Sequence, residues 1–551
     1  MLPIVLMQET LAKLTPQKKN QTALFSLLLF FLTITILGLP FTNWGFKTDD
    51  FGNIYHCKIN SLKDMVNFFT EGNMERFNHA SNSTSDSQAF FAGLYRPVSF
   101  IYYYAQYLLF GTNPYGYFLT TVIFHALNSV LLFNIFIPIA GTIGAFLAAA
   151  FFAFHPSLWN WLGWISAQTY FIELFVLLLL ILALKRYLDS KKTVFYIISC
   201  TLFALNLFLK EATIILPLWI IPAVYLYLDK NPGSLWKSLR VSLGYWLVVV
   251  GYVAARLSMF PLTSNTGSLT FEPTLASFLA RMQSRVLDFV TYAVDMIGFT
   301  TLPANNRIFK GSLLLAFFAL LAWLFIHNQQ KKWMIFFLYS TALFSWPALL
   351  MHYQPRYIYM ALPFFLLMIL VGFKFYQSSY QPKIYKAVSY ALCLIIATHA
   401  YFLFDKLALR ESVLHQVTQS FQTLANNQTL HNRPLCFVGI PSHWFSMGTA
   451  QAMWLLTNNN SYPVYQCDAK MYLAGNDNYL KVPALDKNYL EIIKNEDGFL
   501  LQSLHKDKLW FADETGKRRA QVSLSIPKEA REHNTIFITW DYYKAEFKIL
   551  S

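Results

Sequence analysis

Residues 115–137 read YGYFLTTVIFHALNSVLLFNIFI, a run of apolar and small polar side chains without an Asp, Glu, Lys or Arg. A helix needs roughly 20 such residues to cross the hydrocarbon core of a bilayer. Of the 551 residues of the chain, 55% are hydrophobic and only 13% are charged, whereas soluble domains carry about 25% charged residues. The run therefore predicts one spanning helix in a chain that crosses the membrane repeatedly.

About eleven apolar runs are long enough to span, although one of them, 141–154, must tilt or borrow residues from its flanks. They cover residues 22–40, 115–137, 141–154, 164–184, 193–209, 212–228, 239–260, 309–326, 333–351, 357–373 and 384–404. The first run is too long for a signal peptide. We therefore expect it to be retained as a span, with residues 1–21 as a cytoplasmic tail.

The distribution of Lys and Arg predicts the orientation. The chain carries a net charge of +14, but the basic residues gather in short connections between apolar runs, which favours positive-inside topology over a nucleic-acid surface. Four such clusters are predicted to be cytoplasmic: Lys185, Arg186, Lys191 and Lys192; Lys230, Lys237 and Arg240; Lys331 and Lys332; Lys374, Lys383 and Lys386. This places residues 155–163 outside, so the apolar, tyrosine-rich stretch 98–110 is predicted to lie along the outer interface instead of crossing.

The predicted fold is a polytopic α-helical membrane protein with a C-terminal soluble α+β domain. Residues 22–404 form the transmembrane part, with a first outer loop at 41–114 and another at 261–308 that holds an interfacial or re-entrant apolar stretch. Residues 405–551 are more polar, contain short β-like runs, and fall outside the membrane because the number of spans is odd. Cys436 and Cys467 both lie in this domain, where a disulfide is one alternative and two separate thiols the other.

Two adjacent carboxylates stand soon after the first predicted span. Asp49 and Asp50, in the sequence TDDF, lie at the start of the first outer loop. Neighbouring carboxylates raise one another's pKa, so that one can act as a base toward a hydroxyl while the other positions substrate. The alternative is a solvated loop start, which is the commoner meaning of two adjacent aspartates.

Several cations are predicted at the same outer face. Arg96, in LYRP, heads the interfacial stretch and suits a phosphate, although it could equally be a snorkelling anchor. Lys210 and Glu211 separate two predicted spans, either as functional groups or as an ion pair that satisfies itself. Arg356, in HYQPRY, and His155, in FHP, begin two further outer boundaries.

These motifs, in their order, resemble a known superfamily. The two aspartates, YRP, FGTNPYGYFLTTVIFHALNSVLLF (110–133), FHPSLWNWLGWIS (154–166), LKEATIILPL and PRYIYM look like integral-membrane glycosyltransferases of the GT-C superfamily. The chain is most similar to protein O-mannosyltransferases and the tetratricopeptide-containing transmembrane O-mannosyltransferases. It is more distantly similar to the aminoarabinose transferases of lipid A.

The resemblance implies inverting transfer of a sugar, hexosyl or mannosyl, from a polyprenyl-phosphate donor to an acceptor at the extracytoplasmic face. By analogy Asp49 or Asp50 is the catalytic base. The implied phosphate-binding cations are Arg96, Lys210 and Arg356. Further candidate site residues are Arg281, Arg285, His155 and Glu211. Cations there would neutralise the departing phosphate.

The chain departs from these relatives in two ways. Their WISGR pattern is WISAQ at 164–168 here, and the C-terminal part has no tetratricopeptide period, which leaves the acceptor open. Residues 155–163 also lack the carboxylates by which oligosaccharyltransferases hold a metal, so no metal or cofactor is predicted. Glu173 is interpreted as a buried or paired carboxylate.

The leading hypothesis is therefore a multi-pass inner-membrane glycosyltransferase that takes a lipid-linked sugar from the bilayer. A transporter or flippase for a lipid-linked glycan is one alternative, although it would need charges near the midplane. A noncatalytic membrane scaffold is another, and only the two aspartates argue against it. The sugar, the acceptor and the length of the polyprenyl chain stay open.

Overall fold

The computed structural model describes most of the chain. The described residues are 16–42, 44–46, 48–70, 95–228, 233–259, 291–299, 307–327, 330–350, 354–379, 382–427, 430, 433–438, 449–457, 463–467, 471–473, 490–495, 498–504, 509–512, 518–526, 530, 535–541 and 546–550.

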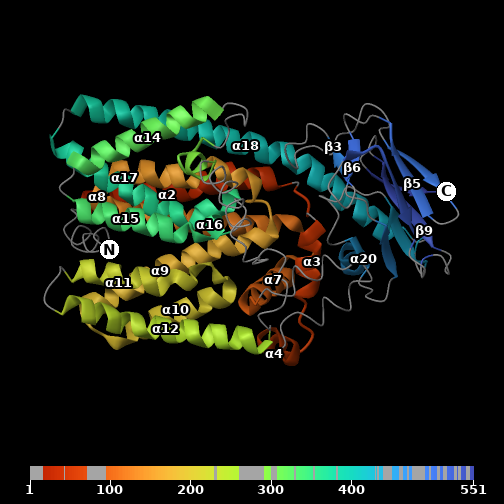
Figure 1. Cartoon of the computed structure of the whole chain (residues 1–551), viewed down its shortest axis with the longest axis horizontal. Coiled ribbons are helices and arrows are strands. Elements are labelled where there is room, and N and C mark those ends of the chain that lie inside the picture. Colours follow the sequence, from red (N-terminus) through yellow and green to blue (C-terminus); the bar gives the residue numbers. More distant parts are fainter. Residues whose placement is uncertain are drawn as a thin grey trace, which may run out of the picture.

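The described part is a bundle of long helices with a β-rich region at one end (Figure 1). Six helical stretches are long and apolar enough to cross a membrane: Lys19–Phe41, Pro114–Trp159, Ile165–Ser190, Ser234–Ser258, Pro355–Phe373 and Val388–Ala408. Three shorter apolar helices, Thr193–Leu209, Glu211–Tyr227 and Gly311–His327, accompany them. The chain is thus a multi-pass membrane protein, as its composition predicted.

The helices of the bundle follow one another along the chain. They are α2 (Pro16–Gly38), α3 (Thr48–His56), α4 (Leu62–Thr70), α7 (Pro97–Phe110), α8 (Pro114–Ala153), α9 (Gln168–Ser190), α10 (Thr193–Leu209), α11 (Leu216–Tyr227), α12 (Ser234–Met259), α14 (Arg307–His327), α15 (Lys331–Phe344), α16 (Trp346–Leu350), α17 (Ile358–Ser379) and α18 (Pro382–Asn426). Short 3-10 turns join some of them: η1 (Leu39–Phe41), η2 (Pro156–Asn160), η3 (Ile165–Ala167), η4 (Glu211–Ile215) and η5 (Pro355–Tyr357).

Helix α8 is a hairpin and supplies two of the predicted spans. Gly141 has φ 67° and ψ 178°, which interrupts the helix, and only glycine adopts such a backbone readily. The imidazole Nε2 of His125 lies 2.9 Å from the carbonyl oxygen of Ala153. These residues would be about 42 Å apart in a straight helix, so the two arms pack side by side, in agreement with the predicted runs 115–137 and 141–154.

Helix α7 begins and ends at the same end of the bundle, near α3 and α4 (Figure 1). At its start, the Ser99 hydroxyl donates to the carbonyl of Leu209 (2.5 Å). Its middle contacts the same end, because the Tyr103 hydroxyl donates to the carbonyl of Ile165 (3.2 Å). Just after it, the carbonyl of Tyr117 accepts from the Gln168 amide (2.7 Å). Helix α7 therefore does not cross the bundle.

The described C-terminal part contains mixed β-sheets. In the largest, the strand order is β10-β9-β1-β2, with β1 parallel to β2 and β9, and β9 antiparallel to β10. The described strands are β1 (Leu435–Val438), β2 (Val464–Cys467), β3 (Met471–Leu473), β4 (Leu490–Lys494), β5 (Gly498–Ser503), β6 (Leu509–Ala512), β7 (Arg518–Arg519), β8 (Gln521–Ser525), β9 (Ile536–Asp541) and β10 (Glu546–Leu550). Helix α20 (Thr449–Thr457) connects β1 and β2.

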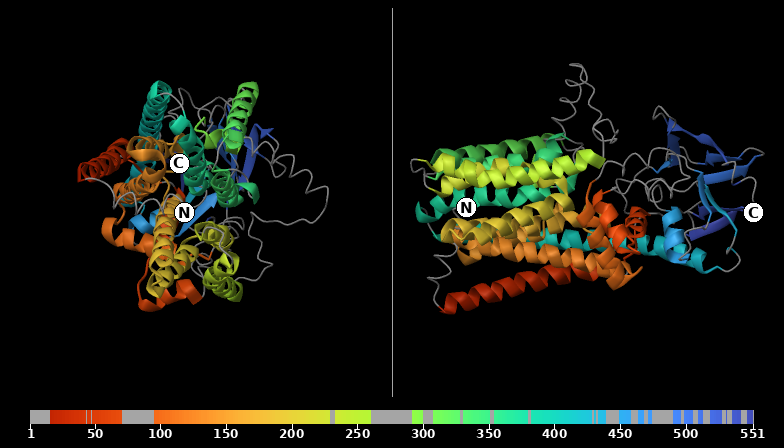
Figure 2. Two further views of the ribbon diagram at one scale, coloured as in Figure 1. Left: turned by 90° about the vertical axis from the view of Figure 1, so that its left-hand side faces the viewer. Right: turned by 90° about the horizontal axis from the view of Figure 1, so that it is seen from below.

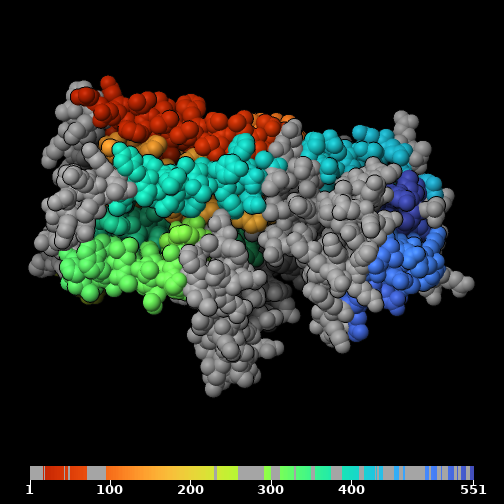
Figure 3. Space-filling view, turned by 90° about the horizontal axis from the view of Figure 1, so that it is seen from above, coloured from red at the N-terminus to blue at the C-terminus, as the bar shows by residue number. Residues whose placement is uncertain are grey.

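Helix α18 joins the bundle to this region. It starts at Pro382, lies beside α2 along one face of the bundle (Figure 3), and continues to Asn426 beneath the sheets (Figure 2). The predicted domain boundary at residue 405 falls inside this unbroken helix. Phe421 of α18 packs on Phe51 of α3 with ring centroids 5.6 Å apart, so the far half of α18 supports the helix that carries the two aspartates.

The strand register bears on the proposed disulfide. Cys436 lies opposite Tyr465, while Cys467 lies opposite Val438. This offset of two residues along neighbouring strands separates the two Cα atoms by about 8 Å. A disulfide spans at most about 7 Å between Cα atoms, so the register favours two separate thiols.

Candidate functional site

Residues 164–170, which read WISAQTY, contact Asp50, Lys210 and Arg356; we refer to them as the 164–170 segment. Trp164 is extended, a 3-10 turn follows, and α9 begins at Gln168. The exposed end of a helix leaves backbone N–H groups without helical partners, which makes this turn a natural attachment point for side chains. Residues from α3, α7, η4 and η5 meet there.

The side chain of Asp50 is fully buried against this segment, and its Oδ1 accepts a hydrogen bond from the backbone N–H of Ile165 (2.9 Å). One turn later in α3, the Asn53 amide donates to the Ser166 hydroxyl (2.6 Å). The backbone of Asp49 belongs to the same helix, but its side chain lies outside the described residues. Asp50 is therefore an anchored carboxylate and not a solvated loop residue.

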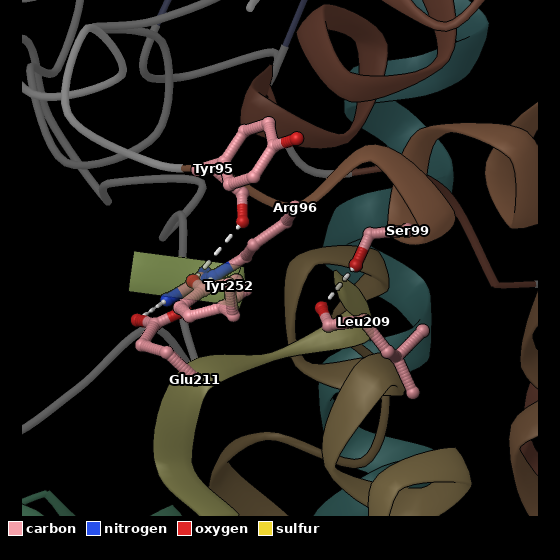
Figure 4. A network of polar contacts seen from close by, with 6 residues as sticks. All are labelled: Tyr95, Arg96, Ser99, Leu209, Glu211 and Tyr252. Carbon is pink, nitrogen blue, oxygen red and sulfur yellow. Dashed lines mark hydrogen bonds and ion pairs between the residues drawn. The ribbon is translucent and has the colours of Figure 1, made fainter. Parts of the chain in front are cut away.

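Arg96 and Glu211 form a bidentate ion pair (Figure 4). The guanidinium Nε lies 2.7 Å from Oε2 and Nη2 lies 2.5 Å from Oε1. Glu211 therefore pairs with Arg96 and not with its neighbour Lys210. Burial opposes the charged guanidinium, but the facing carboxylate prevails and places the pKa of Arg96 above its ordinary value.

The surrounding backbone fixes this ion pair in place. Arg96 precedes Pro97, which disfavours a helical conformation for Arg96; its backbone has φ −135° and ψ 58°, and α7 starts at that proline. The Tyr252 hydroxyl of α12 donates to the carbonyl of Tyr95 (3.3 Å; Figure 4). The guanidinium thus extends from the N-terminal end of α7 toward the junction of α10 and η4.

Lys210 occupies that junction with an extended backbone. Lys210 is 6% exposed, and its ammonium lies 3.9 Å from the centroid of the Tyr170 ring, which is a cation–π contact. Burial is the main cause that lowers the pKa of Lys210 well below its usual range, followed by the charge of Arg96. Lys210 is therefore a buried cation held on the 164–170 segment.

Arg356 reaches the segment from η5. Its guanidinium carbon lies 4.8 Å from the centroid of the Trp164 ring. The Nε atom is buried and has no hydrogen-bond partner among the residues that the structure describes. Two predicted phosphate ligands, Arg96 and Arg356, thus act electrostatically on the third, Lys210.

Sequence reasoning underrated two buried polar groups of α9. Glu173 is fully buried, and within the described part of the chain both of its carboxylate oxygens lack a hydrogen-bond partner. The Gln168 amide donates to Tyr117, while its oxygen has no partner among these residues. The sequence drew attention to Gln168, because this residue replaces the arginine of the WISGR pattern. For Glu173 the sequence showed only a carboxylate within an apolar run.

The remaining described candidate, His155, makes its contacts outside this cluster. His155 is buried, packs on Phe151 with ring centroids 5.4 Å apart, and accepts at Nδ1 from the backbone N–H of Ser157 as the cap of η2. Its role in the structure is that of a helix cap. Arg281 and Arg285 fall outside the described residues.

A second polar network lies deeper in the bundle, and its residues come from the quoted motifs FHALN and PRYIYM. The Tyr359 hydroxyl lies 2.8 Å from Nδ1 of His125 and accepts from the Asn128 amide (3.1 Å). The Asn128 amide also donates to the carbonyl of Phe171 (2.8 Å). These contacts join α8, α9 and α17 beneath the site, so those motif residues have a structural role.

Groups of three or more His, Cys, Asp or Glu side chains that could hold a metal ion were sought in the described ranges, and none occurs there. The predicted metal independence stays a prediction, since Asp49 is among the side chains without a description.

The fold and the charged cluster define a multi-pass membrane protein with a C-terminal mixed β region and a polar site at one end of its bundle. No protein-family model matches this chain, and no curated protein matches its sequence. Solved structures give fold-level likenesses only.

The chain is similar to ArnT from Cupriavidus metallidurans bound to undecaprenyl phosphate, with 12% identity and a TM-score of 0.43 over 86% of this chain and 96% of that chain. It is also similar to the Archaeoglobus fulgidus oligosaccharyltransferase tethered with an acceptor peptide, with 11% identity and a TM-score of 0.46 over 81% of this chain and 64% of that chain. At these values the likeness concerns the course of the chain and carries no assignment of substrate or activity.

Proposed function

We propose that the chain is a membrane glycosyltransferase that moves a sugar from a polyprenyl-phosphate donor to an acceptor hydroxyl at the extracytoplasmic face. The observation that carries the proposal is the contact of Lys210 and Arg356 with the 164–170 segment, beside the Arg96–Glu211 ion pair and the anchored Asp50. Cations and a carboxylate in one partly dry site are what the transfer of a sugar from phosphate requires.

The cluster provides the electrostatic part of the reaction. A leaving phosphate gains negative charge as the glycosidic bond breaks, and preorganised cations stabilise that charge best where water is scarce. Arg96 offers a planar fork suited to phosphate oxygens. Lys210 offers a compact charge. The cluster lies at the end of the bundle and not near its middle, which supports a transferase at the membrane surface over a transporter.

The two aspartates are proposed to divide the remaining work. Asp50 is fully buried and already accepts a hydrogen bond from the backbone N–H of Ile165, so we propose that it holds α3 against the site. Asp49, its neighbour in α3, is then the proposed base that takes the proton from the acceptor hydroxyl as the hydroxyl oxygen attacks the anomeric carbon. The polyprenyl phosphate departs as the leaving group.

Comparison of Asp49→Asn with wild type tests this proposal. Loss of a general base lowers transfer by about 100-fold or more, so we expect cells with the variant to lack the same glycoconjugate as cells without the protein. Mass spectrometry of glycoconjugates and lipid-linked sugars checks the outcome. Asp64→Asn is the matched control in the same loop, because Asp64 caps α4 by accepting hydrogen bonds from the backbone N–H groups of Asn60 and Ser61. A full glycoconjugate level with Asp49→Asn would contradict the assignment.

A further inference from the structure

Glu173 has no task in the proposed reaction, although it is a fully buried carboxylate beside the site. A buried charge without compensation is very costly, so such a group persists only with a partner charge nearby or as a neutral acid. Its oxygens make no hydrogen bond with any described residue. Of the charged groups in the cluster, Lys210 acts most strongly on Glu173 and favours its ionised form.

The position of Glu173 selects Lys210 as its partner. Glu173 follows Tyr170 by three residues in α9, which places the two side chains on neighbouring parts of one helix face. The Lys210 ammonium lies over the Tyr170 ring, 3.9 Å from its centroid. The backbone also joins the two residues, because the Asn206 amide, one turn before Lys210, donates to the carbonyl of Glu173 (3.2 Å).

The charges around Lys210 are two carboxylates that favour its ammonium and two guanidinium groups that oppose it. The charged groups that act on its ammonium come from four elements: Arg96 before α7, Glu211 in η4, Glu173 in α9 and Arg356 in η5. The phenols of Tyr170 and Tyr252 border the same cluster. Glu211 is already bound by Arg96 through two hydrogen bonds, and both arginines repel a third cation. Glu173, unlike Glu211, is bound by neither arginine through a side-chain hydrogen bond among the described residues.

We propose that Glu173 is a positioning residue, the counter-charge that keeps the Lys210 ammonium in the cluster and available to the donor phosphate. This inference rests on the proposed donor site and adds to it a residue that never touches the phosphate. Without the carboxylate, two arginines and the apolar surroundings would favour loss of the lysine proton. Burial and the charge of Arg96 already place the pKa of Lys210 below its usual range, and Glu211 and Glu173 both oppose that shift, so removing the Glu173 carboxylate should lower it further.

The consequence is a pH-dependent phenotype. Lys210 binds phosphate while protonated, so binding falls as the pH rises through the pKa of Lys210. The substitution Glu173→Gln removes the opposite charge and lowers that pKa further, by about one unit or more. The alkaline fall in binding should therefore begin at lower pH. Arginine stays charged at all relevant pH values, so Lys210→Arg in the Glu173→Gln background should restore binding on the alkaline side.

The experiment measures binding of a polyprenyl methyl phosphodiester to the full chain in lipid nanodiscs, between about pH 5 and pH 10. A phosphodiester keeps one charge over this range, whereas a phosphomonoester titrates near pH 6. The proteins are wild type, Glu173→Gln, Lys210→Arg, the double variant and Asp189→Asn. The last is the matched control, because Asp189 is another carboxylate of α9 and is paired with Lys185 far from the cluster.

We expect the binding midpoint of Glu173→Gln to shift to lower pH by about one unit or more, while Asp189→Asn follows wild type and the double variant regains alkaline binding. An unchanged midpoint in Glu173→Gln overturns the inference and leaves the donor site intact. So does a loss of binding at all pH values that Lys210→Arg fails to repair, because Glu173 would then act through folding. If wild type itself binds no phosphodiester, the proposed function fails first.

Discussion

Arg96 stands between two anions, the Glu211 carboxylate that it binds in the structure and the phosphate that it is proposed to bind. The side chains of Arg96 and Glu211 are 20% and 33% exposed, so the ion pair is partly buried. Removing one member of such a pair leaves the other charge without a partner, whereas removing both leaves no unpaired charge. The two roles of Arg96 are therefore separable by experiment.

We predict that Arg96→Gln lowers the free energy of unfolding by about 1 to 3 kcal/mol, because Glu211 loses two charge-assisted hydrogen bonds. Adding Glu211→Gln should recover part of that stability but none of the donor affinity. Thermal unfolding in detergent and phosphodiester binding measure the two effects. Donor binding restored by the second substitution would show that Arg96 serves only to satisfy Glu211.

The partners of these residues were not readable from the sequence. YRP and LKEATIILPL indicated a cation and a charged pair at span boundaries, but Arg96 and Glu211 are 115 positions apart, and only the packing of α7 against the end of α10 brings them together. Hydropathy orders residues by depth along the membrane normal. It carries no information about which neighbours share that depth.

The elements were more predictable than the contacts between them. The long apolar runs coincide with helices because a helix satisfies its own backbone hydrogen bonds in lipid. The parity argument that kept 98–110 from crossing agrees with α7, which starts and ends at one end of the bundle. The sharp return of α8 needed Gly141, whose backbone conformation no composition rule indicates.

At the level of that element, we predict that Gly141→Ala lowers the free energy of unfolding by about 1 to 3 kcal/mol. A Cβ there would meet no atom within 4 Å, so the effect is backbone strain alone at φ 67°. Gly251→Ala in α12 is the matched control, because its added Cβ is equally free of contacts and alanine favours helix. Thermal unfolding should give opposite signs for the two variants, and equal signs would argue against the glycine-dependent hairpin.

Over the whole molecule, the β region and the site lie at one end of the bundle and the start of α2 lies at the other (Figure 1). Helices α18 and α20 contact α3 and the residues before it. Trp454 of α20 packs on Tyr55 with ring centroids 5.4 Å apart, and the backbone N–H of Phe46 donates to the Thr418 hydroxyl of α18 (2.8 Å). The helix that carries Asp49 and Asp50 is thus enclosed between the bundle and the β region, where an acceptor would have to approach.

The side of the membrane on which this end lies is predicted from charge. Helix α9 has 23 residues and is about 34 Å long, so the connection after it, with Lys191 and Lys192, lies a membrane thickness away from the 164–170 segment. Basic connections stay cytoplasmic. The site and the β region should then be extracytoplasmic, where a lipid-linked sugar and an exported acceptor can meet.

Single cysteines in a background without the five native ones test this orientation with a membrane-impermeant maleimide. Glu491→Cys, at an exposed position of β4, should be labelled in intact spheroplasts. Lys192→Cys, equally exposed between α9 and α10, should be labelled only after the membrane is opened, and that later labelling is the control for its reactivity. The reverse pattern would place Arg96, Lys210 and Arg356 in the cytoplasm. That result would contradict transfer at the extracytoplasmic face. The cluster and the β region lie at the same end of the bundle, so both must be on the same side of the membrane.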